Sequence, residues 1–143
     1  MNIYISSSWK NREIVRELAQ GLRTKGENVF DFTNPQDRKC EPIPPERYLE
    51  QFDPDKHNYF EYLNKPEWGD AVRENRKKLT QSDVVILLLP CGIDATADWA
   101  FAVGKGKYTI IIGHPLKGER SPVHLWADWF VKDVDEFWKL YKD

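Results

Sequence analysis

Two short segments of the sequence hold polar side chains of the kinds that carry out chemistry. Ser6-Ser7-Ser8-Trp9 offers hydroxyl and backbone N–H groups just before a predicted helix, a setting that suits an anion or a sugar hydroxyl. Residues 91–98 place Asp94 and Asp98 four residues apart at the start of another predicted helix. The helix dipole favours an ionised carboxylate there, and such a group can attack an anomeric carbon and later leave from the ester. Asp98 is therefore a candidate nucleophile for glycosyl transfer.

The same residues also have structural interpretations. One serine of the first segment can cap the helix that follows, leaving the others in solvent. In the second segment Gly92 permits a sharp turn and Asp94 is placed to cap the helix. In this structural interpretation, Asp98 only complements the dipole of the helix. The sequence contains neither GxxxxGK(S/T) nor GxGxxG, so neither segment is predicted to be a P-loop or a dinucleotide fingerprint.

The elements that must position these segments follow from the spacing of apolar residues. That spacing predicts strands at 2–6, 28–32, 83–90, 109–113 and 129–132, and helices at 11–25, 67–80, 94–105 and 134–141. The first strand, helix and strand form a βαβ unit, and DVVILLLP is typical of a central parallel strand covered on both faces. We therefore predict an α/β fold, a Rossmann-like doubly wound, five-stranded parallel sheet with helices on both faces.

Sheets of this kind bind ligands at the carboxyl ends of their strands, where the strand order reverses. This rule selects three loops of the sequence, at 6–9, 31–34 and 91–98. It adds Asp31 to the candidate residues. It also predicts that polar side chains from distant segments gather at one edge of the sheet.

Length and charge limit the classes of function. The 143 residues fit one domain, 1–143, and 21 basic against 23 acidic side chains argue against a nucleic-acid polymer or an anionic membrane as partner. The longest apolar run, 84–90, is too short to cross a bilayer, and the start lacks the pattern of a signal peptide, so a cytoplasmic location is expected. With two cysteines and no CxxC, HExxH or Cys/His cluster, no metal site is predicted.

The middle of the chain departs from the α/β pattern. Residues 33–66 hold six of the nine prolines, no glycine and many aromatic residues. Short helices are predicted at 46–52 and 57–64, and the segment is interpreted as an ordered insertion, either a lid over the site or a subunit contact. Trp126, Trp129 and Trp138 add more aromatic surface than one small core needs, so a homodimer or higher homo-oligomer is expected.

Three motifs give the chain a resemblance to a known family. They are NIYISSSWKNREIV, VFDFTNP and DVVILLLPCGIDATADWAFAVGKGKYTIII, in this order along most of the chain. They resemble the nucleoside 2-deoxyribosyltransferase-like family, whose short bacterial and phage members read roughly IYxASSWRN, YDFxxP and LPCGRSAHxExGWAVGxGK. The resemblance implies a flavodoxin-like fold and action on the N-glycosidic bond of (deoxy)nucleosides or their monophosphates. It also implies that no cofactor is used and that the chain assembles as dimers or larger.

The resemblance implies roles for the residues at matching positions. Asp98 matches the family's nucleophilic glutamate, and Tyr4 matches the first-strand tyrosine that holds this carboxylate in place. Asn75 falls where many relatives carry an aspartate that contacts the base or assists its departure. Positions in the loops around the substrate are matched by Ser6, Ser7, Trp9, Asp31 and Gly92.

Three residues depart from the family pattern. Asp98 is one methylene shorter than glutamate, and a displacement of about 1 Å can cost on the order of a hundredfold in rate. Asn75 cannot exchange a proton as a carboxyl would. Asp94 replaces a serine that helps to hold the 5′-phosphate in nucleotide-hydrolysing relatives, and its negative charge favours a nucleoside or a differently charged ligand. The serines after the first strand remain an alternative phosphate site.

These observations lead to one leading hypothesis and two alternatives. The leading hypothesis is a deoxyribosyltransferase or N-glycoside hydrolase, in which Asp98 attacks a nucleoside or nucleoside monophosphate. The three departures favour an alternative from another class, a nucleotide-binding or sensing module that keeps the fold without the chemistry. A TIR-like enzyme that cleaves NAD shares the fold class and an acidic nucleophile. The expected partner is a small-molecule nucleoside or nucleotide.

Overall fold

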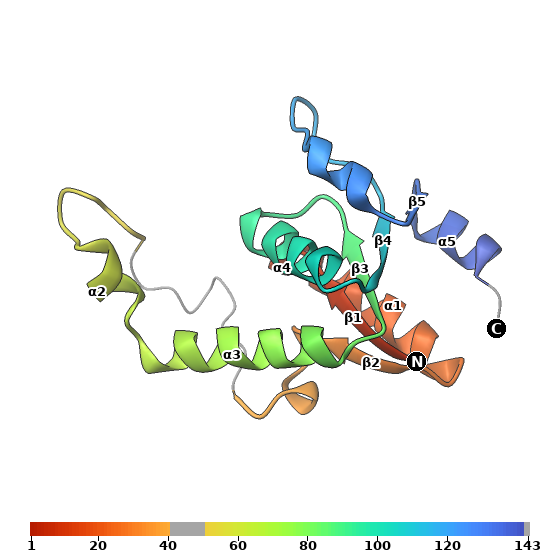
Figure 1. Ribbon diagram of the computed structural model, residues 1–143, viewed down its shortest axis with the longest axis horizontal. Helices are drawn as coiled ribbons and strands as arrows, with labels where there is room; N and C mark the ends of the chain where they lie inside the picture. The colour runs from red at the N-terminus through yellow and green to blue at the C-terminus, as the bar shows by residue number, and fades with distance from the viewer. Residues whose placement is uncertain (41–50, 142–143) are drawn as a thin grey trace.

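Strands and helices alternate along the described residues, 1–40 and 51–141, of the computed structural model (Figure 1). The strands are β1 (Asn2–Ser6), β2 (Asn28–Asp31), β3 (Val84–Leu88), β4 (Tyr108–Ile112) and β5 (Trp129–Val131). The helices are α1 (Arg12–Thr24), α2 (Tyr59–Leu63), α3 (Pro66–Gln81), α4 (Ile93–Gly104) and α5 (Val134–Leu140), with short 3-10 helices at Trp9–Asn11, Pro35–Asp37 and Pro122–Trp126. No helix in the described ranges is both long enough and apolar enough to cross a membrane.

The five strands form one parallel sheet in the order β2-β1-β3-β4-β5. In β1, Tyr4 is paired with Phe30 of β2 on one side and with Val85 of β3 on the other. The chain thus moves outward from β1 to β2 and then returns to the far side of β1, which is the reversal that defines a doubly wound sheet. The predicted fold class is confirmed, and the reversal places the carboxyl ends of β1 and β3 next to each other.

Helices cover both faces of the sheet (Figure 1). α3 and α4 contact the face that carries Tyr4, and Trp99 of α4 is fully buried there. α1 and α5 lie against the opposite face (Figure 1). They meet at Gly21, where a Cβ atom would come within 2.6 Å of the Trp138 ring. The position therefore needs glycine because two helices approach each other closely.

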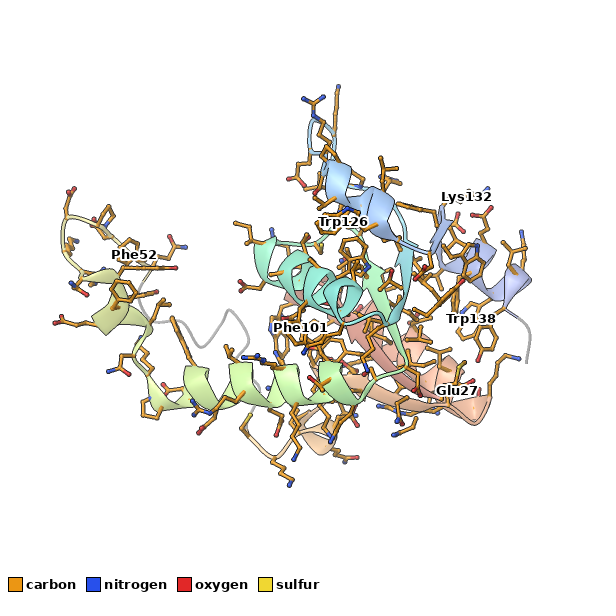
Figure 2. All side chains as sticks on the ribbon, viewed as in Figure 1. Glu27, Phe52, Phe101, Trp126, Lys132 and Trp138 are labelled. Carbon is orange, nitrogen blue, oxygen red and sulfur yellow. The ribbon has the colours of Figure 1, made fainter. Side chains whose placement is uncertain are left out.

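The C-terminal tryptophans divide between the core and the surface. Trp129 and Trp138 both contact the ring of Phe137, which is buried in α5. Trp126 lies at the end of a 3-10 helix and is 56% exposed (Figure 2). Two of the three tryptophans thus belong to the core of this chain, and Trp126 remains available for a contact with another molecule.

Residues 51–65 form an arm that extends beyond the start of α3, away from the sheet (Figure 1). The arm includes α2, which confirms the helix predicted at 57–64. The helix predicted at 46–52 lies almost entirely outside the described residues.

The aromatic residues of the arm pack on one another. Phe52 contacts Tyr59 and Tyr62, and Tyr62 contacts Trp68 in the first turn of α3. Figure 2 shows Phe52 far from Phe101 of α4. Residues 51–65 therefore lie away from α4 and do not form the predicted lid, and their aromatic side chains pack on one another while remaining partly exposed.

Candidate functional site

Tyr4 of β1 and Asp98 of α4 come from distant parts of the sequence and meet above the sheet. The Tyr4 hydroxyl donates a hydrogen bond to Asp98 Oδ2 across 3.4 Å. Tyr4 is only 1% exposed and stacks on Phe30 of β2, with 5.0 Å between the ring centroids. The phenol is thus fixed by its neighbours and presents one donor to the carboxylate.

Burial controls the protonation of this pair. The pKa of the Asp98 carboxyl is raised from 3.8 to about 6, chiefly by burial. The nearby charge of Asp94 also raises this pKa, and the hydrogen bond from Tyr4 lowers it. Burial, together with the charge of Asp98, also raises the pKa of the Tyr4 phenol, which therefore stays protonated and remains a donor. The helix dipole was expected to favour the ionised carboxylate of Asp98. Asp98 lies beyond the first turn of α4, and burial acts in the opposite direction by raising its pKa.

Replacing Tyr4 by phenylalanine should raise the pKa of Asp98 further, because the hydrogen bond from Tyr4 is what lowers it. The stack on Phe30 is kept in this variant. If Asp98 is the nucleophile, activity at neutral pH should fall by about tenfold, and the acidic limb of the pH–rate profile should move to higher pH. Carboxyl-carbon NMR of both proteins measures the pKa without relying on activity. An unchanged pKa would contradict a role for Tyr4 in tuning Asp98.

The first two serines join the segments around Asp98. Ser6 Oγ donates to the carbonyl of Ala95 in α4 at 3.1 Å, and Ser7 Oγ donates to the carbonyl of Leu88 at the end of β3 at 2.8 Å. Both side chains are buried. Ser6 therefore lies beside the helix that carries Asp98 and Ser7 beside the end of β3, and their hydroxyl protons are used to hold these elements in place.

Asn11 takes part in the same network and was missed by the sequence analysis. Its Nδ2 donates to Ser7 Oγ at 3.0 Å and to the carbonyl of Pro90 at 2.7 Å. Ser8 is the serine that caps a helix, because its Oγ accepts from the backbone N–H of Lys10. The sequence feature that could have identified Asn11 is its position directly after the serine loop, where its side chain can reach the same segments.

Trp9 and Asp31 contact other partners than the Tyr4–Asp98 pair. Trp9 meets the ring of Phe32 edge-on, with 5.3 Å between centroids. Asp31 is paired with Ile5, the residue that follows Tyr4 in β1. Because side chains alternate along a strand, Asp31 points from the face of the sheet opposite to Tyr4. Its Oδ1 accepts from the backbone N–H and the hydroxyl of Thr33, while Oδ2 is buried without a hydrogen-bond partner among the described residues.

The helix that carries Asp98 begins one residue earlier than predicted. Its N-cap is Gly92 rather than Asp94, and Asp94 is exposed in the first turn. The extended backbone of Gly92 leads directly from the end of β3 into the helix. Asp94 and Asp98 lie one turn apart on the same side of α4, so two carboxylates face one region and disfavour an anionic group there.

Asn75 of α3 is held by Arg38, a residue that the sequence analysis also missed. Arg38 Nη1 donates to Asn75 Oδ1 at 2.9 Å and to the carbonyl of Phe32 at 3.3 Å. Arg38 Nη2 donates to the carbonyl of Ala71 at 3.4 Å, and Nε lies 3.5 Å from Glu74 Oε1. The signal for Arg38 was a basic residue shortly after the end of β2, but it lay in the segment interpreted as an insertion.

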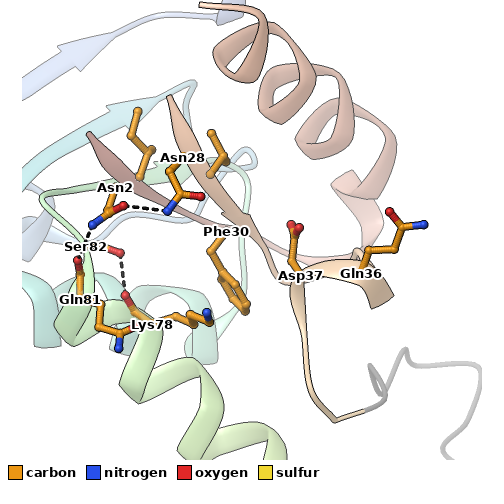
Figure 3. A pocket seen from close by; sticks show the side chains of 10 residues that line it. Asn2, Asn28, Phe30, Gln36, Asp37, Lys78, Gln81 and Ser82 are labelled. Atoms are coloured by element: carbon orange, nitrogen blue, oxygen red, sulfur yellow. Dashed lines mark hydrogen bonds between the residues drawn. The ribbon is translucent and has the colours of Figure 1, made fainter. Parts of the chain in front are cut away.

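Two cavities lie away from these residues. One, of about 520 Å³, opens at the amino ends of β1 and β2, where Asn28 Nδ2 donates to Asn2 Oδ1 at 2.7 Å (Figure 3). Lys78 and Ser82 at the end of α3 line its other side. A second cavity, of about 380 Å³, is lined mainly by apolar side chains of the sheet and α5. We place the candidate site at Asp98 instead, because doubly wound sheets bind ligands at the carboxyl ends of their strands.

The chemical groups around Asp98 are its own carboxylate, that of Asp94 and the Tyr4 phenol, and the Arg38 guanidinium is close enough to act on the charge of Tyr4. In the part of the chain that the structure describes, no three His, Cys, Asp or Glu side chains gather closely enough to hold a metal ion. Fold and site together define a doubly wound α/β protein of the flavodoxin-like type with a partly buried carboxylate beside the reversal in strand order.

Comparisons with known proteins agree with this description. A 2-deoxyribosyltransferase from Bacillus psychrosaccharolyticus superimposes with a TM-score of 0.59 over 99% of this chain and 93% of its own, at 16% identity. A CMP N-glycosidase from Clostridium botulinum superimposes with a TM-score of 0.53 over 97% of this chain and 95% of its own, at 12% identity. No family model matches the sequence, and no curated protein does. At these identities the likeness establishes the fold.

Proposed function

We propose that this protein cleaves the N-glycosidic bond of a nucleoside, or transfers the sugar to a second base, with Asp98 as the nucleophile. The observation that carries the proposal is the partly buried Asp98 carboxylate, which accepts a hydrogen bond from the Tyr4 hydroxyl and whose pKa is raised to about 6. Such a carboxylate is ionised at neutral pH yet only partly solvated, which favours attack. The names of the two structural neighbours, a deoxyribosyltransferase and an N-glycosidase, support this class of reaction.

The reaction proceeds in two displacements. Tyr4 holds Oδ2 of Asp98, which leaves Oδ1 to attack the anomeric carbon C1′ of the sugar. The C1′–N bond breaks, its electron pair stays on the base nitrogen, and an ester joins the sugar to Asp98. Water or a second base then attacks C1′, the ester bond returns its electrons to Asp98, and the proton of the attacking group passes to solvent.

The substrate in this proposal is a nucleoside in preference to its monophosphate. Asp94 is exposed on the same side of α4 as Asp98, and its charge already raises the pKa of Asp98. A phosphate close to this pair would face two negative charges with a helix N-terminus as partial compensation.

Replacing Asp94 by serine should shift this preference. The kcat/KM for a monophosphate relative to its nucleoside is expected to rise by about tenfold, because one repelling charge is removed. The acidic limb of the pH–rate profile should move to lower pH, because the charge of Asp94 raises the pKa of Asp98. Glu17→Gln, which removes an exposed charge on the opposite face, is the matched control. If both variants change the ratio equally, the preference does not originate at Asp94.

A panel assay tests the proposed function directly. The protein is incubated with deoxyribonucleosides, ribonucleosides, their monophosphates and NAD, and free base is followed by chromatography, with and without a second base as acceptor. We expect base release from at least one nucleoside. Release of nicotinamide from NAD alone would favour a TIR-like activity instead, and no release from any compound would remove the catalytic proposal.

One specific observation favours a binding module as the second candidate. The hydroxyls of Ser6 and Ser7 and the oxygen of Asn75 are all engaged within the protein, which leaves few free groups to act on a substrate. Nucleoside binding by calorimetry without base release would support this alternative.

We also propose that the protein is a homodimer or a higher homo-oligomer. The arm at 51–65 and the adjacent part of α3 leave apolar side chains in solvent, among them Phe60 at 79% and Val72 at 65% exposure. Such surface is typical of a subunit contact. Light scattering at micromolar concentration should give at least twice the mass of one chain, and a monomer would contradict the proposal.

A further inference from the structure

Arg38 is a buried cation between the segment that follows β2 and helix α3. Its side chain is only 3% exposed. Its terminal nitrogens donate to three oxygen acceptors, which are Asn75 Oδ1 at 2.9 Å and the carbonyls of Phe32 at 3.3 Å and Ala71 at 3.4 Å. Nε lies 3.5 Å from Glu74 Oε1, so one carboxylate partly balances the charge. Burying a guanidinium costs free energy even when it is paired, and packing alone does not require a cation here.

A continuous line of contacts joins Arg38 to the Tyr4–Asp98 pair. The guanidinium carbon lies 5.7 Å from the centroid of the Phe30 ring. Phe30 stacks on Tyr4, with 5.0 Å between centroids and 26° between ring planes, and the Tyr4 hydroxyl donates to Asp98 Oδ2 at 3.4 Å. Both rings are buried, so little water is present to screen the charge of Arg38 from the phenol.

A positive charge at this position acts on the proton of the Tyr4 phenol. Burial raises the pKa of Tyr4 most, and Asp98 raises it further, whereas the charge of Arg38 lowers it. A phenol that holds its proton less tightly is a stronger hydrogen-bond donor. The hydrogen bond from Tyr4 in turn lowers the pKa of Asp98. Both steps act in one direction, because each favours the ionised carboxylate of Asp98.

Lys78 provides an internal comparison, because it lies over the same ring. Its Nζ is 5.9 Å from the centroid of Phe30. Unlike Arg38, Lys78 is only half-buried and lines the open cavity shown in Figure 3, where solvent screens its charge. The cation that acts on Tyr4 is therefore Arg38.

Other charged side chains lie beside this line of contacts or against Phe101, the aromatic ring one turn after Asp98 on α4. They are Glu74, Lys78, Asp94, Arg76 and Lys105. Asp94 raises the pKa of Asp98, and Glu74 reduces the effective charge of Arg38 by pairing with it. Arg38 therefore acts against burial and Asp94, and Glu74 limits its effect.

We propose that Arg38 is a positioning residue for the candidate nucleophile: through the Phe30–Tyr4 stack, its charge strengthens the hydrogen bond from Tyr4 and holds Asp98 in the ionised form that attacks the sugar. This inference rests on the proposed function and deepens it, because it names the group that keeps the nucleophile ionised. Arg38 lies outside the three sequence motifs that contain Tyr4 and Asp98.

Carboxyl-carbon NMR measures the pKa of Asp98 in each variant without relying on activity. Arg38→Met removes the charge and should raise this pKa, and the acidic limb of the pH–rate profile should move to higher pH by about half a pH unit or more. Arg38→Lys keeps a cation and should restore most of the wild-type value. Lys78→Met, which removes the screened charge on the same ring, is the matched control and should leave the pKa as it is.

Two further variants test the sign and the route of the effect. Glu74→Gln should lower the pKa of Asp98, because it leaves the charge of Arg38 unbalanced while three oxygen acceptors still hold the guanidinium. It also provides a test that does not depend on the folding of Arg38→Met. In Tyr4→Phe the stack is kept and the hydrogen bond is lost, so adding Arg38→Met should change the pKa of Asp98 by less than half as much as in the wild type.

These outcomes decide the inference separately from the proposed function. An Asp98 pKa that stays unchanged in folded Arg38→Met, or that does not fall in Glu74→Gln, overturns the inference. So does a rise that Lys78→Met reproduces, that Arg38→Lys fails to reverse, or that is equally large in the Tyr4→Phe background. If no compound of the panel releases its base, the proposed function fails. The NMR titrations still decide whether Arg38 controls the ionisation of Asp98.

Discussion

Asp98→Asn should abolish base release while leaving the protein folded. Asparagine has the same shape as aspartate and still accepts the hydrogen bond that Tyr4 donates to this position. Its amide cannot form the ester, so kcat should fall by about a thousandfold or more. The measurement is initial-rate base release from the best nucleoside of the panel, with the circular dichroism spectrum of each protein recorded alongside.

Two further measurements make this result specific. Wild-type kcat/KM should rise about tenfold per pH unit up to about pH 6 and then level off, because only the ionised carboxylate of Asp98 attacks. Asp98→Glu keeps a carboxylate and should retain activity to within about a hundredfold, whereas Glu17→Gln should behave as the wild type. Full activity of Asp98→Asn, or a rate that is already maximal at pH 4, would exclude Asp98 as the nucleophile.

The sheet was predictable because its central strands β3 and β4 are buried on both faces. β3 and β4 are nearly continuous apolar runs, and their short length and β-branched residues favour buried parallel strands over helices. The reversal in strand order then places the ends of β1 and β3 together without any knowledge of side chains. This reasoning alone brought Ser6, Ser7 and Asp98 to one place.

The insertion resisted prediction because its conformation depends on contacts rather than on local pattern. Its prolines remove the helical and strand periodicities on which sequence reasoning relies. The arm instead follows from the contacts of Phe52 and Tyr62 with aromatic neighbours. A sequence shows that such residues are present, but not whether they pack on the sheet or on one another.

The electrostatics of the candidate site were only partly accessible from sequence. Helical spacing placed Asp94 and Asp98 on one side of α4, but it could not show how far Asp98 is removed from solvent. The depth of burial that raises the pKa of Asp98 is a property of the packed fold. The same holds for Arg38, whose link to Asn75 joins residues 37 positions apart. Tertiary contacts thus decide both the protonation of Asp98 and the orientation of the Asn75 amide.

Asp98→Asn should also stabilise the protein at neutral and alkaline pH. The native state raises the pKa of Asp98 from 3.8 to about 6, so the unfolded chain loses this proton at lower pH than the folded one. Between these two values the folded state binds more protons, and the free energy of unfolding falls as the pH rises. Above about pH 6 the ionised carboxylate costs the native state up to about 3 kcal/mol. Asparagine carries no charge and avoids this cost.

Urea unfolding of the wild type and of Asp98→Asn at several pH values measures the effect. The variant should be more stable near pH 8, and its advantage should shrink by about 2 kcal/mol near pH 4.5, where Asp98 is protonated in the native state. Glu17→Gln, which removes an exposed carboxylate, should show no comparable gain at pH 8. A gain that does not change with pH would come from packing instead. A pH-dependent gain accompanied by loss of activity would identify Asp98 as a residue that is retained at a cost in stability because it performs the chemistry.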